Sequence, residues 1–251
     1  MIHSFLLIGQ SNMAGRGRKE EVEPIPNKDI YVLRNGRWWP MYVPVNPDRV
    51  TAGINLSESF VYRYLQEHPG VQVGIIPCAD GGTQLNQWMP GEVIYDHAVM
   101  TAKLAQRSSQ IMGILWHQGE SDCVDGKYQL YEEKCSHILT SMRRDLGLEN
   151  TPLMLGGLGD FLAVYKDGSK KDIYPKVNEA LREMAKKLPN TAFVSAEGLG
   201  HNGDDLHFNA QALREFGLRY YAEFLKLRHE ETGEPVIDSA DALKITEIEK
   251  L

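Results

Sequence analysis

Five continuous apolar segments of strand length, each followed by a segment of helical period, constrain the fold of this chain more than any other feature. The apolar segments are residues 4–8, 71–77, 111–116, 152–156 and 191–195. They do not alternate with polar residues, which is typical of strands buried on both faces of a parallel sheet. The amphipathic segments are residues 57–67, 95–107, 128–146, 174–187 and 209–227. We therefore predict an α/β doubly wound fold with right-handed crossovers and a mainly five-stranded parallel sheet.

Two regions interrupt this alternation. Residues 15–56 form a long connection rich in Arg, Pro, Asn and aromatic residues, and a connection of that length is usually functional or disordered. Residues 228–251 are rich in charge, and they either dock as an additional helix or pair with another subunit of a homo-oligomer. No repeat divides the chain, so we expect one domain spanning 1–251, with 228–251 as a C-terminal extension.

Composition excludes several classes of protein. Hydrophobic residues make up 42% of the chain and charged residues 24%, values that exclude a disordered or collagen-like chain. The net charge is −7, from 27 Lys and Arg against 34 Asp and Glu, so neither nucleic acid nor an anionic membrane is an expected partner. Three scattered cysteines, no signal segment and no membrane span favour a cytoplasmic protein. Metal-ligand and nucleotide motifs are also missing, so we expect no cofactor and no metal.

Polar motifs follow the predicted strands at the edge where an open α/β sheet binds ligands. GQSNMAG follows the first strand and predicts a turn into a helix, with Ser11 as either a cap or a nucleophile. The paired glycines of GGT, which end at Gly82, form either a plain tight turn or an exposed N–H donor. WHQGESD groups an amide, a carboxylate and an imidazole where the third strand ends. Asp204 precedes His207 by three residues, in either a solvated loop or a turn that orients the imidazole.

Together these motifs supply a hydroxyl nucleophile, a base, a carboxylate to orient the base and donors for an oxyanion, which is an acyl-transfer set. In this order they resemble an SGNH-type hydrolase, and more narrowly the sialate O-acetylesterase group, which includes carbohydrate esterase family 6 acetylxylan esterases. The resemblance extends from Gly9 to the helix after His207. It implies a flavodoxin-like three-layer α/β/α domain that hydrolyses O-acetyl esters on carbohydrates without a metal.

Carried over to this sequence, the resemblance implies that Ser11 is the nucleophile and His207 the general base. The oxyanion hole would be formed by the N–H groups of Ser11 and Gly82 and by the side chain of Gln118. SGNH enzymes at large have Asn at the third position, whereas the acetylesterase group shares the Gln found here. The implied substrate is a small acetylated sugar or oligosaccharide, such as an acetylated xylo-oligosaccharide or a sialic acid.

Two candidates exist for the acid. Asp204 fits the D-x-x-H pattern and is our choice, while Glu120 in HQGE is a rival or a second orienting group. Two other functions also stay open at this point. One is a lipid or thioester hydrolase of the wider SGNH group, and the other is a carbohydrate-binding protein that kept the fold and lost the chemistry.

Other side chains near this edge have both a functional and a structural interpretation. For Trp38, Trp39 and Trp88 the sequence leaves three roles open: a platform for a sugar ring, a lid over the site, or part of the core. Arg16 either meets an anionic substrate or is a solvated loop charge. His117 either lines the pocket or has a structural role.

Overall fold

The computed structural model describes residues 1–26 and 28–232. Its strands are β1 (Ile2–Gly9), β2 (Ile30–Arg34), β3 (Arg37–Pro40), β4 (Val73–Pro77), β5 (Ser109–His117), β6 (Leu153–Gly156) and β7 (Thr191–Val194). Its α-helices are α1 (Ser11–Ala14), α2 (Ser57–Glu67), α3 (Val93–Gln106), α4 (Tyr131–Leu146), α5 (Tyr165–Gly168), α6 (Tyr174–Lys187) and α7 (Ala210–Thr232). Short 3₁₀ turns occur at Lys19–Glu21, Leu85–Trp88, Tyr128–Leu130 and Asp160–Ala163.

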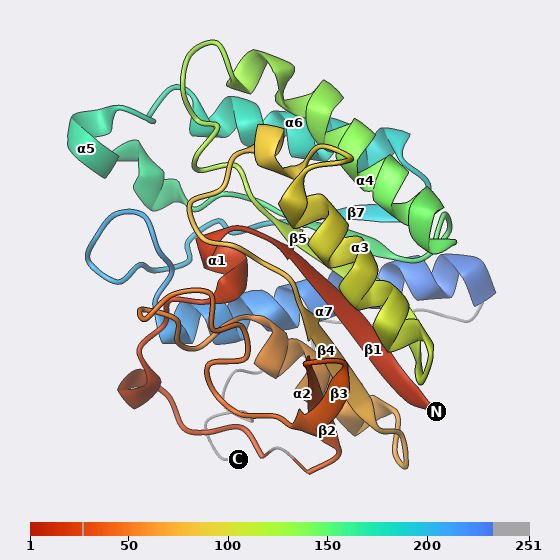
Figure 1. Cartoon of the computed structure of the whole chain (residues 1–251). Coiled ribbons are helices and arrows are strands. Elements are labelled where there is room, and N and C mark those ends of the chain that lie inside the picture. The colour runs from red at the N-terminus through yellow and green to blue at the C-terminus, as the bar shows by residue number, and fades with distance from the viewer. Residues whose placement is uncertain (27, 233–251) are drawn as a thin grey trace.

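The strands form one sheet in the order β3-β2-β4-β1-β5-β6-β7. All neighbouring strands are parallel except β2 and β3, which are antiparallel. Helices α3, α4 and α6 cover one face of the sheet, and α2 and α7 cover the other (Figure 1). The predicted three-layer α/β/α fold is therefore confirmed.

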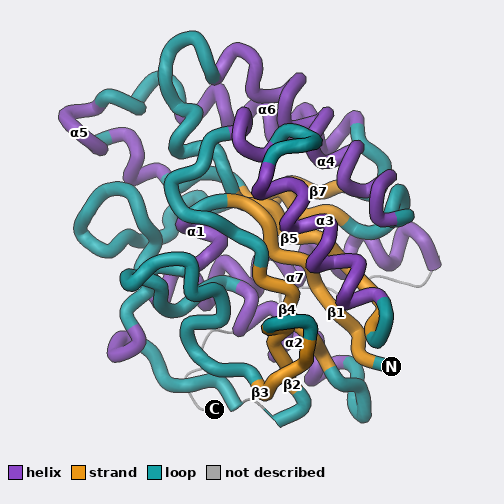
Figure 2. Tube along the Cα trace, in the orientation of Figure 1, coloured by secondary structure: helices purple, strands orange, loops and turns teal. Residues whose placement is uncertain are grey.

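The sheet has seven strands, so the prediction of a mainly five-stranded sheet was wrong in number. Both additional strands lie in residues 15–56, which we expected to be a connection. Asn35 and Gly36 join them with φ angles of 50° and 71°, the left-handed backbone that a tight hairpin turn requires. Figure 2 shows this hairpin at one margin of the sheet. An Asn-Gly pair between two β-prone runs is a strong hairpin signal, and it was present in the sequence.

The expected helices agree closely with the structure. Two of them, α2 and α6, have the predicted bounds. The last helix begins at Ala210, and the side chain of Asn209 caps it by accepting a hydrogen bond from the N–H of Ala212 at 2.8 Å. Helix α7 continues to Thr232, so the beginning of the predicted extension is helical. The rest of that extension, 233–251, lies outside the described residues.

A buried apolar core holds the central strands in place. Phe5, at the middle of β1, is fully buried. Its ring meets Phe60, Tyr64 and Phe224 edge-on, with centroids 4.8, 5.0 and 5.6 Å away. Such edge-to-face pairs add about 0.5–1.5 kcal/mol each to the free energy gained from burial. Strand β1 is thus packed against both α2 and α7 on one face of the sheet, and the backbone that leaves its carboxyl end starts from a rigid position.

The strand order places a ligand-binding crevice at the carboxyl end of β1. After β1 the chain forms β2 and β3 at one margin of the sheet, returns to β4 beside β1, and then crosses to β5 on the other side of β1. Such a reversal of direction opens a crevice. Two backbone hydrogen bonds hold the three strand ends together. Gln10 N–H donates to the carbonyl oxygen of His117 at 2.9 Å, and Asp80 N–H donates to that of Gly9 at 3.0 Å.

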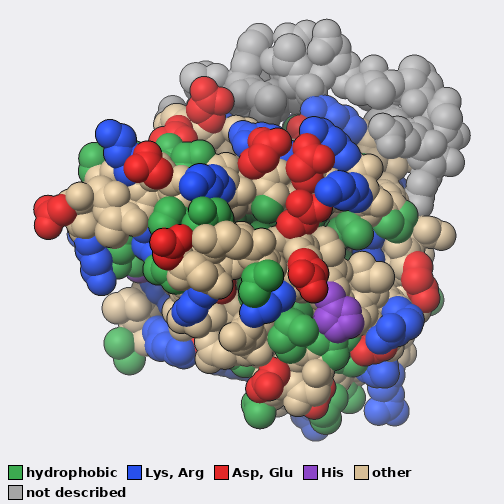
Figure 3. Space-filling view, turned by 90° about the horizontal axis from the view of Figure 1, so that it is seen from above, with side chains coloured by type: hydrophobic (Ala, Val, Ile, Leu, Met, Phe, Trp, Pro, Cys, Tyr) green, Lys and Arg blue, Asp and Glu red, His purple; other side chains and the backbone are tan. Residues whose placement is uncertain are grey.

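The surface carries charge of both signs. On the face seen in Figure 3, Lys and Arg side chains are interspersed with Asp and Glu. Within residues 1–26 and 28–232, no helix combines the length and the apolar character needed to cross a membrane. The three cysteines, Cys78, Cys123 and Cys135, are buried and free.

Candidate active site

Ser11 occupies the first position of α1, directly after β1. The Oγ atom of Ser11 lies 3.0 Å from Nε2 of His207, although the two residues are 196 positions apart in the chain. Residues 4–9 of β1 are buried, and the turn after the strand is where a hydroxyl, that of Ser11, first lines a cavity. The predicted nucleophile and base are therefore within hydrogen-bonding distance.

Asp204 completes a chain of three side chains. Its Oδ2 lies 2.7 Å from Nδ1 of His207, and its Oδ1 accepts hydrogen bonds from the N–H groups of Leu206 and His207 at 3.0 and 2.8 Å. A carboxylate only accepts, so Nδ1 is the donor and the neutral imidazole presents the lone pair of Nε2 to Ser11. Partial burial favours a raised pKa for Asp204, but the hydrogen bonds from His207 and Leu206 outweigh it and lower the pKa below its ordinary value.

The Glu120 carboxylate is hydrogen-bonded to His117 and Asn12 rather than to His207. The buried Glu120 carboxylate accepts from Nε2 of His117 at 3.1 Å and from Nδ2 of Asn12. Burial alone would raise the pKa of Glu120, but the attraction of His117 and the hydrogen bonds from His117 and Asn12 hold the pKa below its ordinary value. Of the two predicted acids, Asp204 therefore has the geometry of the acid beside the base, and Glu120 has that of a second orienting group.

The Gly81–Gly82 turn forms part of the wall of the site. The Asp48 carboxylate accepts hydrogen bonds from Nη1 and Nη2 of Arg16, at 3.0 and 2.8 Å. Its Oδ2 also accepts a hydrogen bond from the N–H of Gly81 at 2.8 Å. A Cβ at position 81 would overlap the Arg16 guanidinium, and Gly82 has a φ of 79°. Glycine is thus required at both positions, by close approach at the first and by backbone conformation at the second. Arg16 is a buried, paired charge rather than a solvated one.

Gln118, the predicted third oxyanion donor, is turned away from the cavity. Its Nε2 donates to Asp122 Oδ2 at 2.6 Å and also lies 3.1 Å from the carbonyl oxygen of Thr83 and 3.2 Å from Oε1 of Gln10. The side chain is fully buried and is not among the described residues that line the cavity. Both amide hydrogens are already taken up by these acceptors, so the structure does not bring Gln118 to the place where an oxyanion would form.

A cavity of about 350 Å³ opens beside the Ser11 hydroxyl. Its lining consists of Gln10, Ser11, Arg16, Gly81, Gly82, Glu120, Ser121, Tyr165, Lys170, Leu206 and His207. Sequence analysis missed Tyr165 and Lys170, which come from α5 and the segment after it. Lys170 is buried, and its Nζ donates to the carbonyl oxygens of Glu120 and Cys123 at 2.7 and 3.2 Å. No motif surrounds either residue, so only the tertiary structure could place them here.

The structure also decides the roles of the other singled-out side chains. Trp88 is fully buried in the core, and Trp39 is 51% exposed. Trp38 packs over Gly74 and donates to the hydroxyl of Ser108 at 3.0 Å. None of the three is among the described residues that line the cavity. His117 is likewise fully buried, behind Glu120.

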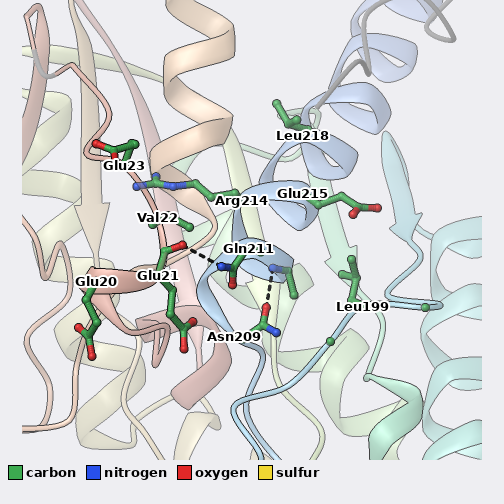
Figure 4. Close-up of a pocket in the computed structure, with 13 residues that line it drawn as sticks. Glu20, Glu21, Val22, Glu23, Leu199, Asn209, Gln211, Arg214, Glu215 and Leu218 are labelled. Carbon is green, nitrogen blue, oxygen red and sulfur yellow. Dashed lines mark hydrogen bonds between the residues drawn. The ribbon is translucent and has the colours of Figure 1, made fainter. Parts of the chain in front are cut away.

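A second cavity, of about 490 Å³, lies between residues 20–23 and the first turns of α7 (Figure 4). Glutamates surround it, and Nε2 of Gln211 donates to the backbone oxygen of Glu21 at 2.8 Å. As far as the described residues form it, its lining includes no hydroxyl, thiol or imidazole and therefore lacks an acyl-transfer set. In residues 1–26 and 28–232, no three His, Cys, Asp or Glu side chains converge as a metal ion would require.

Comparison with known proteins gives consistent matches over most of the chain. Residues 1–226 match a family model described as carbohydrate esterase, sialic acid-specific acetylesterase. A probable carbohydrate esterase of Arabidopsis thaliana is 28% identical over 243 residues, which span 88% of this chain and 89% of that protein. A solved Arabidopsis thaliana structure aligns with a TM-score of 0.79 at 27% identity, covering 89% of this chain and 98% of its own. The NanS structure shares the fold, with a TM-score of 0.72 at 17% identity over 91% of this chain and 98% of its own.

Proposed function

The chain belongs to the carbohydrate esterase family of sialic acid-specific acetylesterases and is a carboxylic ester hydrolase, and from this premise we propose that it removes O-acetyl groups from a carbohydrate through an acetyl-Ser11 intermediate. The proposed substrate is an O-acetylated sugar of small size, either an acetylated xylo-oligosaccharide or a sialic acid. One observation carries the proposal. A continuous chain of hydrogen-bonding atoms runs from Ser11 Oγ through both ring nitrogens of His207 to the Asp204 carboxylate.

In the first half-reaction, Ser11 Oγ attacks the carbonyl carbon of the acetyl ester while Nε2 of His207 takes the hydroxyl proton. The carbonyl oxygen becomes an oxyanion, which the N–H groups of Ser11 and Gly82 stabilise, since both residues line the cavity. The bond between the acyl carbon and the sugar oxygen then breaks, and His207 gives its proton to the departing sugar hydroxyl. The acetyl group stays on Ser11.

In the second half-reaction, water attacks the acetyl-Ser11 carbonyl carbon, and His207 takes a proton from the water. Collapse of the second tetrahedral intermediate breaks the bond to Ser11 Oγ, returns the proton to that oxygen and releases acetate. Asp204 keeps the imidazole in the tautomer with hydrogen on Nδ1 and stabilises the imidazolium that forms twice in each turnover.

The size and lining of the cavity support acetyl rather than long acyl chains. At about 350 Å³ the cavity has room for a sugar ring beside the nucleophile, and its lining combines the glycine turn and several polar side chains with Tyr165 and Leu206. A lipid hydrolase requires an apolar channel for its acyl chain, whereas Arg16 and Lys170 bring two charges to this lining.

The first experiment compares aryl acetate, butyrate and octanoate as substrates for the wild type and for Ser11→Ala, without added metal. We expect hydrolysis that is selective for acetate and disappears in Ser11→Ala, after which a panel of O-acetylated sugars identifies the natural class. Activity that survives Ser11→Ala, or no hydrolysis of any ester, would overturn the proposed mechanism.

A further inference from the structure

The side chain of Asn12 contacts both chain neighbours of His207. Asn12 follows Ser11 on α1 and is 1% exposed. Its Nδ2 donates to the carbonyl oxygen of Leu206 at 3.0 Å, and its Oδ1 accepts from the N–H of Phe208 at 3.1 Å. One planar amide therefore holds the backbone immediately before and immediately after His207.

The segment that carries His207 is also held by Asn202, whose Nδ2 donates to the carbonyl oxygen of Arg16 at 2.8 Å, but it has little buried area. Residues 201–207 are half-buried or exposed, and the Asp204 side chain is 46% exposed. Asp205 adopts a positive φ of 55°. Segments with little buried area open more readily than the core around them. The bonds to the buried Asn12 thus hold this segment at the point where the imidazole must be kept in place.

Glu120 fixes the orientation of the Asn12 amide. The Oε1 atom of Glu120 accepts a hydrogen bond from Asn12 Nδ2 and a second from Nε2 of His117. A carboxylate oxygen only accepts, so the amide cannot turn over and exchange its oxygen and nitrogen. The backbone of Glu120 is itself held, because its carbonyl oxygen accepts from Lys170 Nζ at 2.7 Å.

We propose that Asn12 is a positioning residue for His207, acting through the backbone on both sides of the imidazole and oriented by Glu120. Ser11 and Asn12 are adjacent on one short helix, so this amide ties the base to the same rigid element that carries the nucleophile. A displacement of about 1 Å between reacting groups can lower a rate on the order of 10²-fold. The inference rests on the proposed function, in which His207 must take the proton of Ser11.

The pattern of bonds requires asparagine in particular. The side chain must donate to Leu206 and Glu120 while accepting from Phe208, which needs an amide of this length. Aspartate has the same shape but cannot donate, and it would set a second carboxylate against Glu120. Serine is neutral and small, but its hydroxyl cannot span both sides of His207.

The experiment compares Asn12→Asp and Asn12→Ser with a matched control, Asn178→Asp. Asn178 is also buried, and its amide also contacts both backbone groups of one residue, accepting from Leu158 N–H at 2.7 Å and donating to the Leu158 carbonyl oxygen at 3.1 Å. We expect kcat for aryl acetate to fall on the order of 10²-fold in both Asn12 variants, with KM within about threefold of the wild type. In Asn178→Asp, kcat should stay within about twofold.

A second measurement does not depend on turnover. The hydrogen bond between His207 Nδ1 and Asp204 should give a downfield imidazole proton resonance, and this resonance should persist in Asn178→Asp and broaden or vanish in Asn12→Ser. The proposal is overturned if the Asn12 variants keep both kcat and the resonance, or if Asn178→Asp loses both to the same extent. Ser11→Ala separates the two proposals. Activity that survives it refutes the proposed function and leaves the resonance to decide the role of Asn12. If Ser11→Ala is inactive while the Asn12 variants keep both kcat and the resonance, only the role of Asn12 is refuted.

Discussion

Replacing Asp204 in two different ways tests whether it controls the tautomer of His207. Two backbone N–H groups, from Leu206 and His207, donate to Oδ1 of Asp204. In Asp204→Asn the amide oxygen should keep these two donors, which leaves the NH₂ group facing Nδ1 of His207. The imidazole must then accept at Nδ1 and carry its hydrogen on Nε2, where it cannot take the proton of Ser11. In Asp204→Ser the hydroxyl can still accept from the turn but does not reach the imidazole.

The structure sets the size of each effect. Unit charges about 4 Å apart interact by about 1 kcal/mol in water and about 4 kcal/mol at an effective dielectric constant of 20. The Asp204 side chain is 46% exposed, so a value near 2 kcal/mol is appropriate for its stabilisation of the imidazolium. Asp204→Ser should therefore lower kcat about 30-fold. Asp204→Asn adds the wrong tautomer and should lower kcat on the order of 10³–10⁴-fold.

The assay is initial-rate hydrolysis of an aryl acetate at pH 8. Thermal unfolding of each variant checks that it is folded at the assay temperature. The reasoning is refuted if Asp204→Ser loses as much kcat as Asp204→Asn, or more. That result would mean that charge alone, and not the tautomer, is what Asp204 contributes.

Three further predictions concern neighbouring residues. The pKa of Glu120 is lowered from 4.5, so the ionised carboxylate contributes stability above pH 4.5, and this contribution is lost as the pH falls through the folded-state pKa. In urea unfolding, the difference in free energy of unfolding between the wild type and Glu120→Gln should therefore narrow from pH 6 to pH 3. A constant difference would contradict this prediction. Gln118→Ala leaves buried Asp122 with the backbone N–H of Leu85 but without its side-chain donor, and it should lower the free energy of unfolding by about 1–3 kcal/mol with less than a tenfold loss of kcat. A loss of 10²–10³ in kcat would return Gln118 to the oxyanion hole. A Cβ at Gly156 would overlap the Tyr220 hydroxyl, so Gly156→Ala should cost about 1–3 kcal/mol, and an unchanged Tm would show that the β6 end is more open than the structure indicates.

Local signals in the sequence predicted most of the fold. Continuous apolar segments predicted β1, β4, β5, β6 and β7. A strand that is buried on both faces carries apolar residues at successive positions, because neither face is exposed to solvent. The β2–β3 hairpin was missed, because its strands are short and lie in a polar connection, and only Asn35–Gly36 marked them. The order of the strands was not predicted, because right-handed crossovers restrict the possible orders without selecting one.

At the site, sequence patterns and tertiary structure contribute different things. The motifs alone determined which chemical groups this chain offers, namely the hydroxyl of Ser11, the imidazole of His207 and their acidic partners, because a turn at a buried strand end has no packing reason to carry such groups. Only the tertiary structure placed Asp204 rather than Glu120 beside His207, bonded Gln118 to Asp122 outside the cavity lining and brought Lys170 into that lining. The physical reason is that hydrogen bonding acts over about 3 Å and depends on direction. Residue spacing along the chain sets neither the distance nor the direction once the partners belong to different strands.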